Sequence, residues 1–510
     1  MFPTQKIDEL FRVWQEGRGA GGVLIVNHKG ERLERCYGYQ NIETGTPMSR
    51  DSVFHLASMS KQITGMCICM LYEQGKLKLD DDVRRYIPDL IRVSRPIMIT
   101  HLLHHTSGLP DNYGFLFLSG LNKFDRVTHA QMMRLTKRID RLNFEPGEEY
   151  AYSNVNYDFL AVIVERITGM PFARFCMENI FAPLGMSHTV VRDDPEMLIP
   201  NRVSSYMDDG YTYKNAIFNL CMYGSTGVQS TAQDMEIYLH QYTNPTLISR
   251  DTMNRVLLNS GVLNDGTPIT YAGGVFVEKM NEHRIIHHGG VNAGFRTMGL
   301  CMPDDDLYVI LLSNTQNLAI EAAARDVARL VLGLPARNTD LLAPYKNEEA
   351  KVEEGFYYSE DLYDGFSITG SGDKVCCNHV PLTPLGANGY KLGRVDVSFA
   401  FGKEPMLARY GGLKKLTCYS GMPEQVQEYV GDYECRMYDS KWKVLWEDDA
   451  LWLYHLRHGR MPMYWVGGER FCCEQARYDF CRDERGKING FVRVTGRQRY
   501  MLFEKTENNE

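Results

Sequence analysis

The chain has 510 residues, of which 44% are hydrophobic and 24% charged, and its formal net charge is −8. These fractions are typical of a globular protein and exclude collagen-like, coiled-coil and largely disordered chains. The acidic balance and the lack of a polybasic run argue against nucleic acid as a partner, and no apolar run is long enough for a membrane-spanning helix. At about 150 residues per domain, the length predicts about three domains.

The expected elements, taken in chain order, begin with a helix over residues 5–16 and a hairpin of strands 23–26 and 32–37. Further helices are expected at residues 58–74, 154–168, 172–181 and 319–332, and strands at residues 274–279, 284–287, 295–302 and 307–312. Strands at both ends with helices between them predict one antiparallel sheet built from distant segments and flanked by helices, an α+β fold.

After about residue 340 the helical periodicity ends. Short runs rich in aromatic and β-branched residues recur there between Gly and Asp turns, for example at residues 443–446, 451–454 and 491–494. Such spacing is typical of small antiparallel barrels or sandwiches. We therefore expect an α+β domain over residues 1–338, followed by two small antiparallel β-barrel domains over residues 339–425 and 426–510.

The thirteen cysteines include tight pairs, such as Cys67 with Cys69 and Cys472 with Cys473. This spacing favours free thiols in a reducing compartment over a disulfide framework. The N-terminal segment lacks the basic and apolar regions of a secretory signal, so we expect a cytoplasmic protein. No CxxC or HExxH pattern occurs, so we expect no metal and no cofactor.

Ser58-Met-Ser-Lys61 places a serine and a lysine one helical turn apart, on one face and within hydrogen-bonding reach. A helix beginning at Ser58 would favour anionic character on its oxygen and disfavour the ammonium form of Lys61. A lysine kept neutral by burial can take the serine proton and activate a weak nucleophile. The same spacing starts at Ser371 and Ser440, so an ordinary surface pair is the alternative; the amphipathic helix after Ser58 distinguishes this copy.

Tyr152-Ser-Asn154 is a second candidate, between a Pro-Gly turn and an expected helix. A tyrosine beside a Ser–Lys pair can shuttle a proton, and Asn154 can hold the lysine or a substrate carbonyl. Tyr-x-Asn also occurs at four other places in the chain, so a packing role for Tyr152 is the alternative.

The third candidate is His288-Gly-Gly-Val291, at the end of an expected strand. Gly289 and Gly290 would let a substrate backbone approach the strand edge. The amide of Val291 could then stabilise an oxyanion together with the amide of Ser58, and His288 would face the tyrosine.

Three other histidines are expected to have structural roles. His287 precedes the third candidate motif, and His104 and His105 form a pair in THLLHHTSGLP. A lone histidine near a motif is more often a satisfied core residue than a catalytic one.

The order and spacing of the three motifs resemble the serine β-lactamase and penicillin-binding-protein superfamily, in particular its class C-like branch. Supporting phrases are Ile99-Thr-His-Leu-Leu103, His105-Thr-Ser-Gly-Leu-Pro110, Ile180-Phe-Ala-Pro-Leu-Gly-Met186, Gly224-Ser-Thr-Gly-Val-Gln-Ser-Thr231 and His288-Gly-Gly-Val-Asn-Ala-Gly-Phe295. The resemblance covers residues 5 to about 335. It implies a β-lactamase/DD-peptidase-like fold and a serine hydrolase that works through an acyl-enzyme.

The length, the HxG pattern in place of KTG and the trailing β domains most resemble the D-aminopeptidases. That resemblance implies that Ser58 is the nucleophile, that Lys61 and Tyr152 transfer protons, that Asn154 contacts substrate and that His288 belongs to the third motif. The implied reaction is hydrolysis of an amide or peptide that carries a D-residue.

Alternatives stay open at this point. An esterase, a β-lactamase or a DD-carboxypeptidase-like hydrolase would use the same residues, and a non-catalytic penicillin-recognising scaffold is the alternative from another class. We expect a small-molecule or short-peptide substrate, no nucleic acid and no membrane, and a homo-oligomer is left open. The resemblance also suggests that a loop around residues 458–462 caps the active site.

Overall fold

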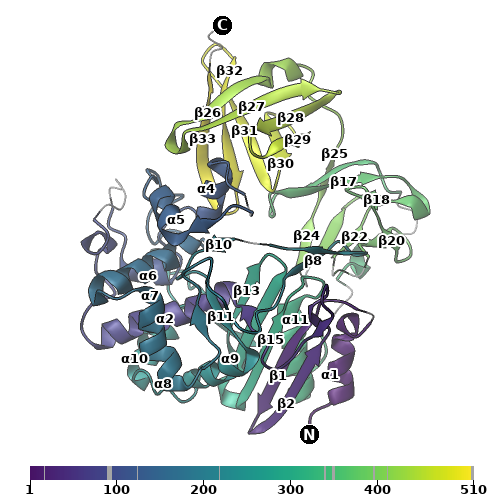
Figure 1. Cartoon of the computed structure of the whole chain (residues 1–510). Helices are drawn as coiled ribbons and strands as arrows, with labels where there is room; N and C mark the ends of the chain where they lie inside the picture. Colours follow the sequence, from purple (N-terminus) through teal and green to yellow (C-terminus); the bar gives the residue numbers. More distant parts are fainter. Residues whose placement is uncertain are drawn as a thin grey trace. The chain divides into compact units, whose positions relative to one another are not determined.

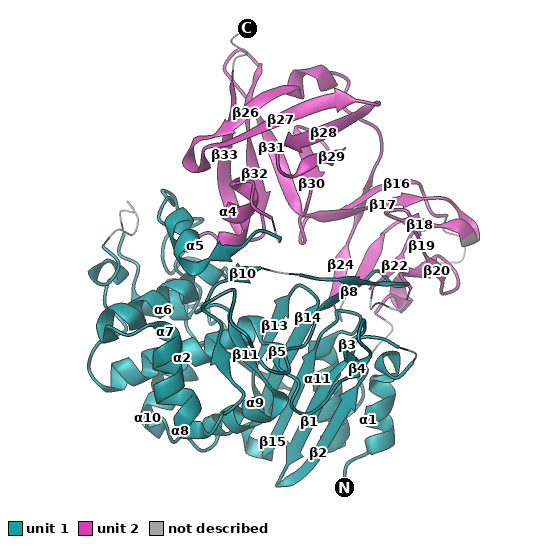
Figure 2. Ribbon diagram, viewed as in Figure 1, with its two compact units in different colours: residues 1–109, 123–337 teal, residues 110–122, 338–510 magenta. Residues whose placement is uncertain are grey.

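The computed structural model describes residues 1–506 except residues 17, 89–94, 123, 218, 338–340, 347–350, 394, 396 and 410–411. The chain forms two compact units (Figure 2). The first consists of Met1–Leu109 and Lys123–Arg337, and the second of Pro110–Asn122 and Asn338–Glu510. A short piece of the N-terminal half therefore belongs to the C-terminal unit. The expected boundary between residues 338 and 339 lies outside the described residues, and the one between residues 425 and 426 stays a prediction.

The first unit is built on a six-stranded antiparallel sheet in the order β12-β13-β14-β15-β1-β2 (Figure 1). Its strands are β1 (Gly22–His28), β2 (Glu31–Tyr37), β12 (Phe276–Met280), β13 (His283–Asn292), β14 (Phe295–Met302) and β15 (Leu307–Ser313). Strand β1 pairs with β15, from Gly22 opposite Ser313 to His28 opposite Leu307. The N-terminal hairpin thus joins strands nearly 300 residues away, which confirms the predicted sheet.

One face of this sheet is covered by α1 (Thr4–Leu10) and α11 (Ile320–Leu332). Leu24 lies opposite Leu311 and Val26 opposite Val309, and all four side chains are fully buried in this layer. Alternate residues of a strand share a face, so the apolar positions of β1 and β15 form one surface for the two helices. Each such side chain contributes roughly 1.5–3 kcal/mol by burial.

The other face is covered by α9 (Ala232–Leu239) and by the segment that leads into α2 (Ser60–Glu73). Every residue of α2 from Ser60 to Leu71 is buried, so this helix runs through the interior, packed beside α6 (Asn154–Thr168). A helix buried all round is apolar on every side unless its polar groups have partners. The lysine in its first turn is therefore expected to have specific partners.

The second unit is rich in β structure. Two five-stranded sheets, in the orders β19-β18-β17-β16-β25 and β20-β21-β22-β23-β24, share an apolar core that includes Tyr357, Ile368, Phe399 and Leu407. Their strands are β16 (Gly355–Ser359), β17 (Asp364–Thr369), β18 (Cys376–Cys377), β19 (Val380–Pro381), β20 (Thr383–Pro384), β21 (Gly389–Lys391), β22 (Val397–Ala400), β23 (Met406–Arg409), β24 (Gly412–Lys415) and β25 (Thr417–Tyr419).

The strands that follow close into an eight-stranded antiparallel barrel. They are β26 (Gly431–Cys435), β27 (Ser440–Glu447), β28 (Ala450–His455), β29 (Gly459–Trp465), β30 (Arg470–Cys473), β31 (Ala476–Arg482), β32 (Ile488–Thr495) and β33 (Gln498–Thr506). Closure leaves no exposed sheet edge. The β-rich C-terminal region predicted from the sequence is thus present.

The piece of chain at Pro110–Asn122 carries α4 (Asn112–Leu118), which packs against this barrel (Figure 2). The ring of Phe115 stacks on Tyr438 with centroids 5.0 Å apart, and Phe117 lies 5.1 Å from Trp442. His458, in the loop expected to cap the active site, stacks on Phe117 and donates from Nε2 to its carbonyl oxygen (3.0 Å). His458 therefore contacts α4 within its own unit, and residues 459–462, expected as a loop, belong to strand β29.

All thirteen cysteines are free thiols. The Sγ atoms of Cys67 and Cys176 are 3.7 Å apart, which is a contact and not a disulfide bond. Among the helices in the described ranges, none combines the length and the apolar composition needed to cross a membrane.

Candidate active site

Ser58 lies in a 3₁₀ turn, Ala57–Met59, that links β5 (Phe54–His55) to α2. The α-helix thus begins two residues later than the sequence predicts. Ala57 has a φ of 51°, in the left-handed region that alanine rarely adopts, and its N–H donates to Nδ1 of His55 (2.9 Å). This strained turn presents the half-buried Ser58 side chain ahead of the helix, and such strain is often found at active sites.

The amine of Lys61 is fully buried and faces three oxygens. Its Nζ lies 2.8 Å from Oδ1 of Asn154, 2.8 Å from the carbonyl oxygen of Ser225 and 3.3 Å from Oγ of Ser58. Three elements therefore converge on one amine, and two of the contacts hold it beside the Ser58 hydroxyl. The structure brings together Ser58, Lys61 and Asn154, as predicted.

The loop that supplies the Ser225 carbonyl is fixed against α2 and α6. Gly224 has a φ of 95°, and a Cβ there would lie 2.4 Å from the carbonyl oxygen of Tyr157, so only glycine fits. Its own carbonyl accepts from Oγ1 of Thr64 (2.7 Å), and the N–H of Ser225 donates to Oδ1 of Asp158 (3.1 Å). These contacts set the carbonyl direction that Lys61 requires.

Tyr152 contributes an aromatic wall beside the lysine. The Lys61 amine lies 4.7 Å from the centroid of the Tyr152 ring and 5.8 Å from that of Tyr157. Tyr271 meets Tyr152 edge to face at 5.8 Å. These rings therefore line one side of the Lys61 amine.

His105, expected to be structural, is packed against this wall. Its ring centroid lies 4.3 Å from that of Tyr152 and 4.6 Å from that of Tyr271. Its Nδ1 accepts from the backbone N–H of Ser153 (3.3 Å) and lies 2.9 Å from the side-chain amide of Asn156. The histidine thus holds the Tyr152 backbone and ring together.

His288 is buried on β13, 6.2 Å from Tyr152 between ring centroids. Its Nδ1 lies 2.6 Å from the carbonyl oxygen of Gly289, which can only accept, so Nδ1 carries the proton and Nε2 accepts from the hydroxyl of Tyr271 (3.0 Å). Burial, and then the nearby Lys61, lower its pKa to about 3, so the imidazole is neutral. Its direct partner is Tyr271, a residue that the sequence motifs do not include.

The glycines after His288 lie beside the turn that carries the serine. A Cβ on Gly290 would be 2.2 Å from the carbonyl oxygen of Leu56 and 3.0 Å from Cβ of Ala57, whereas a Cβ on Gly289 would meet nothing closer than 3.4 Å. Strand β12 pairs with β13 only as far as His287. In the described part of the chain, the segment from His288 to Asn292 therefore has an open edge, at which Val291 is 66% exposed.

A model of the beta-lactamase family matches residues 7–333, more than half of the 510 residues. The chain belongs to the beta-lactamase family. The match includes all three motifs, and it confirms the resemblance inferred from their order. The protein is a serine hydrolase of that family.

Several known proteins are similar to this chain in sequence or in fold. The D-aminopeptidase of Gluconobacter oxydans (strain 621H) is 29% identical over 436 residues, which is 82% of this chain and 80% of that protein. The octameric penicillin-binding protein homologue from Pyrococcus abyssi has a TM-score of 0.61 at 17% identity, over 98% of this chain and 100% of that one. D-amino acid amidase from Ochrobactrum anthropi SV3, complexed with D-phenylalanine, has a TM-score of 0.52 at 19% identity, over 64% of this chain and 98% of that one. The two structures confirm the fold class.

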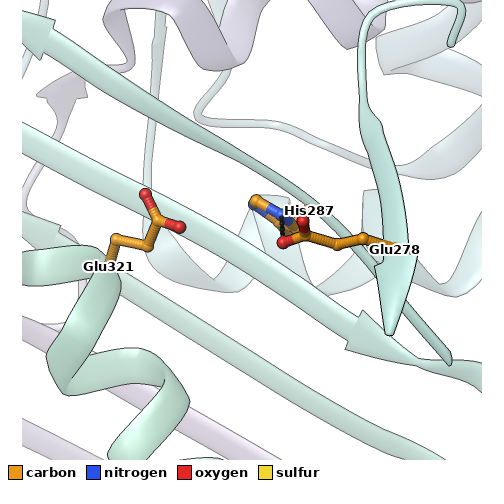
Figure 3. A group of neighbouring side chains, drawn as sticks. All are labelled: Glu278, His287 and Glu321. Atoms are coloured by element: carbon orange, nitrogen blue, oxygen red, sulfur yellow. Dashed lines mark hydrogen bonds and ion pairs between the residues drawn. The ribbon is translucent and has the colours of Figure 1, made fainter. Parts of the chain in front are cut away.

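One cluster in this beta-lactamase fold has the ligand types of a metal site (Figure 3). Ligand atoms of Glu278, His287 and Glu321 lie within 4.8 Å of one another, and Nε2 of His287 is 2.7 Å from Oε1 of Glu278. The guanidinium of Arg325 also contacts Glu278 and lies 3.0 Å from Oε1 of Glu321. The hydrogen bond from His287 lowers the pKa of Glu278, burial raises it and Arg325 lowers it, and together they bring it to about 2. A protein cation thus already balances the carboxylates, so we interpret the cluster as an ion-pair network that contains His287.

Sequence reasoning missed two residues that complete the active-site wall, His105 and Tyr271. His105 begins the segment His105-Thr-Ser-Gly-Leu-Pro110, which supports the family resemblance and could have indicated a role for it. Tyr271 precedes Gly273-Gly274, and a Cβ on Gly274 would lie 2.5 Å from the carbonyl oxygen of Lys61. That close approach places Tyr271 beside the lysine, and no spacing rule predicts it.

Proposed function

We propose that the protein is a D-stereospecific aminopeptidase or amidase that forms an acyl-enzyme on Ser58. The observation that carries the proposal is the position of the Lys61 amine, 3.3 Å from the serine oxygen and fixed by two further oxygens. The D-stereospecific part rests on the similarity to the D-aminopeptidase over 82% of this chain.

The hydrogen-bond pattern suits a lysine that acts as a base. A neutral amine has two N–H bonds and one lone pair. Donation of the two N–H bonds to Asn154 and to the carbonyl of Ser225 directs the lone pair at Oγ of Ser58. The serine proton then moves to Lys61 as Oγ attacks the substrate carbonyl.

The attack converts the carbonyl oxygen into an oxyanion. We assign its stabilisation to the backbone amides of Ser58 and Val291, because the open edge of β13 lies against the serine turn. The C–N bond then breaks, and the leaving amine takes the hydroxyl proton of Tyr152. Lys61 then passes the proton that it took from Ser58 to Tyr152. Water attacks the acyl-enzyme by the reverse proton path, which frees the acid and restores Ser58.

A panel of D- and L-aminoacyl p-nitroanilides tests this function. Wild type is expected to release p-nitroaniline from D- but not L-substrates, and Ser58→Ala is expected to release none. Release from simple esters or opening of a β-lactam without D-anilide hydrolysis would assign an esterase or β-lactamase-like activity instead. A folded wild type that acts on none of these compounds would favour the non-catalytic scaffold.

A further inference from the structure

A pocket in the first unit adjoins the turn that carries Ser58. Its volume is about 350 Å³, and its lining includes His55, Arg202, Ser204, Asn215, Asn292 and Phe295. None of the three catalytic motifs contributes a lining residue. The mechanism above therefore leaves this pocket without a role.

The pocket lies next to the active site along two segments of the chain. His55 is three residues before Ser58, at most about 11 Å along an extended chain, and its Nδ1 holds the N–H of Ala57. Asn292 directly follows Val291 on β13 and lies 3.1 Å from Nε2 of His55. A substrate bound along the open edge of β13 would reach the pocket at the end of that strand.

The pocket contains an arginine that forms no ion pair with a described carboxylate. Arg202 lines it, and its side chain makes no ion pair or hydrogen bond with another described residue. Arg192 is a buried neighbour of Arg202. Its Nη2 donates to the carbonyl of Pro195 (2.7 Å), but its Nε has no partner among the described residues. Burial, and then Arg192, lower the pKa of Arg202. The Arg202 side chain is exposed, so its guanidinium is open to a ligand, and the buried Arg192 adds to the positive charge.

The amide of Asn292 adds a donor to this charge. Burial, and then the two arginines, lower the pKa of His55 to about 3, so its ring is neutral and has a single N–H. Because Nδ1 accepts from Ala57, that proton lies on Nε2 and must be donated to the amide oxygen of Asn292. In this orientation the NH₂ group of Asn292 has no partner among the described residues. Asn292 lies in the pocket wall and is 9% exposed.

We propose that this pocket binds a carboxylate of the substrate, with Arg202 as the ionic contact and the Asn292 NH₂ group as a second donor. An ionised oxygen acceptor is what an unpaired guanidinium and an amide donor bind best. One carboxylate lies near the rim, since Asn215 donates to Oε1 of Glu43 (2.6 Å), and it pairs with that amide rather than with Arg202. The inference rests on the proposed function, because it names a group of the molecule that Ser58 cleaves.

The charge also excludes one part of the substrate. Like charges repel, so the free α-ammonium of a D-aminoacyl substrate does not enter this pocket. The carboxylate belongs either to the side chain of the acyl residue or to the residue that leaves. Two pairs of compounds that differ only in charge separate these sources.

The acyl side is tested with D-glutamyl and D-glutaminyl p-nitroanilide, and the leaving side with D-alanylglycine and D-alanylglycinamide. For one of these two pairs, whichever carries the carboxylate in the position that reaches the pocket, wild type is expected to show a kcat/KM about tenfold or more higher for the compound with the carboxylate. Arg202→Gln is expected to remove that preference, and Arg202→Lys to keep part of it. Arg255→Gln removes an exposed arginine that pairs with Asp251 and is expected to leave the ratio unchanged.

Two further measurements separate failure of the pocket from failure of the proposed function. Mass labelling of Ser58 by a fluorophosphonate tests the nucleophile alone, and calorimetric titration with glutarate against neutral glutaramide tests the pocket alone. Glutarate binding that Arg202→Gln abolishes supports the pocket even if no amide is cleaved. The pocket proposal is overturned if folded wild type binds neither compound and if Arg202→Gln leaves both charge ratios unchanged.

Discussion

The imidazole ring of His105 lies 4.3 Å, centroid to centroid, from the ring of Tyr152, and its Nδ1 accepts from the N–H of Ser153, the next residue. One buried side chain therefore fixes both the backbone and the ring of the tyrosine. In the proposed mechanism the tyrosine hydroxyl delivers a proton, and proton transfer requires a short, directed hydrogen bond. His105 acts here as a positioning residue.

His105→Phe keeps a ring of similar shape but removes the acceptor for Ser153. We expect kcat to fall by about tenfold or more, with a smaller change in KM, because the tyrosine is displaced while the binding edge of β13 is kept. His104→Phe is the matched control, since Nε2 of His104 lies by the carbonyl of Asn259 instead. Equal effects of the two substitutions on kcat would contradict a specific role for His105.

Gly290→Ala tests the approach of β13 to the serine turn. A Cβ at Gly290 would lie 2.2 Å from the backbone oxygen of Leu56, so the strand or the turn must move. We expect activity to fall by about a hundredfold or more, as for misplacement of a reacting group by about 1 Å. Gly289→Ala, where the nearest atom is 3.4 Å away, is expected to retain most of the activity measured on the same anilide.

Lys61→Met separates catalysis from stability. The substitution removes a base, which typically costs about 10²–10⁴-fold in kcat. It also removes the donor to the carbonyl of Ser225. The unpaired carbonyl lowers the free energy of unfolding by about 1–3 kcal/mol, separately from the effect on kcat. Urea unfolding and anilide hydrolysis measure the two effects, and the exposed Lys76→Met is the control for both. Full activity in a folded Lys61→Met protein would refute the role of the lysine.

Acid is expected to destabilise the first unit through its buried histidines. Burial lowers the pKa of His55, His129 and His288 to about 3 and that of His104 to about 4, against about 6.5 in the unfolded chain. Between these values only the unfolded state binds the proton. Stability is therefore unaffected by these groups above pH 6.5 and falls below it, by about 1.4 kcal/mol per pH unit for each histidine.

Urea midpoints between pH 7.5 and 4.5 measure this slope. His129→Phe removes one of the titrating groups at a position where the ring stacks on Tyr223. We expect this variant to lose stability less steeply than wild type as the pH falls. A wild-type midpoint that does not change below pH 6.5 would show that these histidines are not buried in neutral form.

Phe115→Ala is expected to destabilise the C-terminal barrel, although Phe115 lies more than 300 residues before the first barrel strand, β26. The Phe115 side chain is fully buried and stacks on Tyr438, and such a truncation typically costs about 3–5 kcal/mol. Four of the five tryptophans, including Trp442, lie in the barrel, so tryptophan fluorescence during urea unfolding reports the effect. The exposed Phe124→Ala is the control, and an equal midpoint for both variants would contradict the docking of α4.

The sequence predicted those features that depend on local periodicity. Alternating apolar residues located the hairpin and the late strands, and helical spacing located α6 at its observed bounds, Asn154–Thr168. The Ser58–Lys61 spacing placed the two side chains together because a 3₁₀ turn and a helix both bring residues i and i+3 to one side.

Features that depend on contacts between distant segments were not predicted. The helix starts at Ser60 because Ala57 is held in a left-handed conformation by His55, which propensity cannot show. His105 and Tyr271 reach Tyr152 from separate loops. Arg192 and Arg202 carry no motif, and only the fold shows that their charges meet beside His55.

The central claim, that Ser58 is an acylatable nucleophile activated by Lys61, is tested most directly by intact mass after incubation with a fluorophosphonate. We predict one adduct per chain for wild type, none for Ser58→Ala, and strongly slowed labelling for Lys61→Met. An unlabelled but folded wild type, or an adduct of equal yield on Ser58→Ala, would contradict the account.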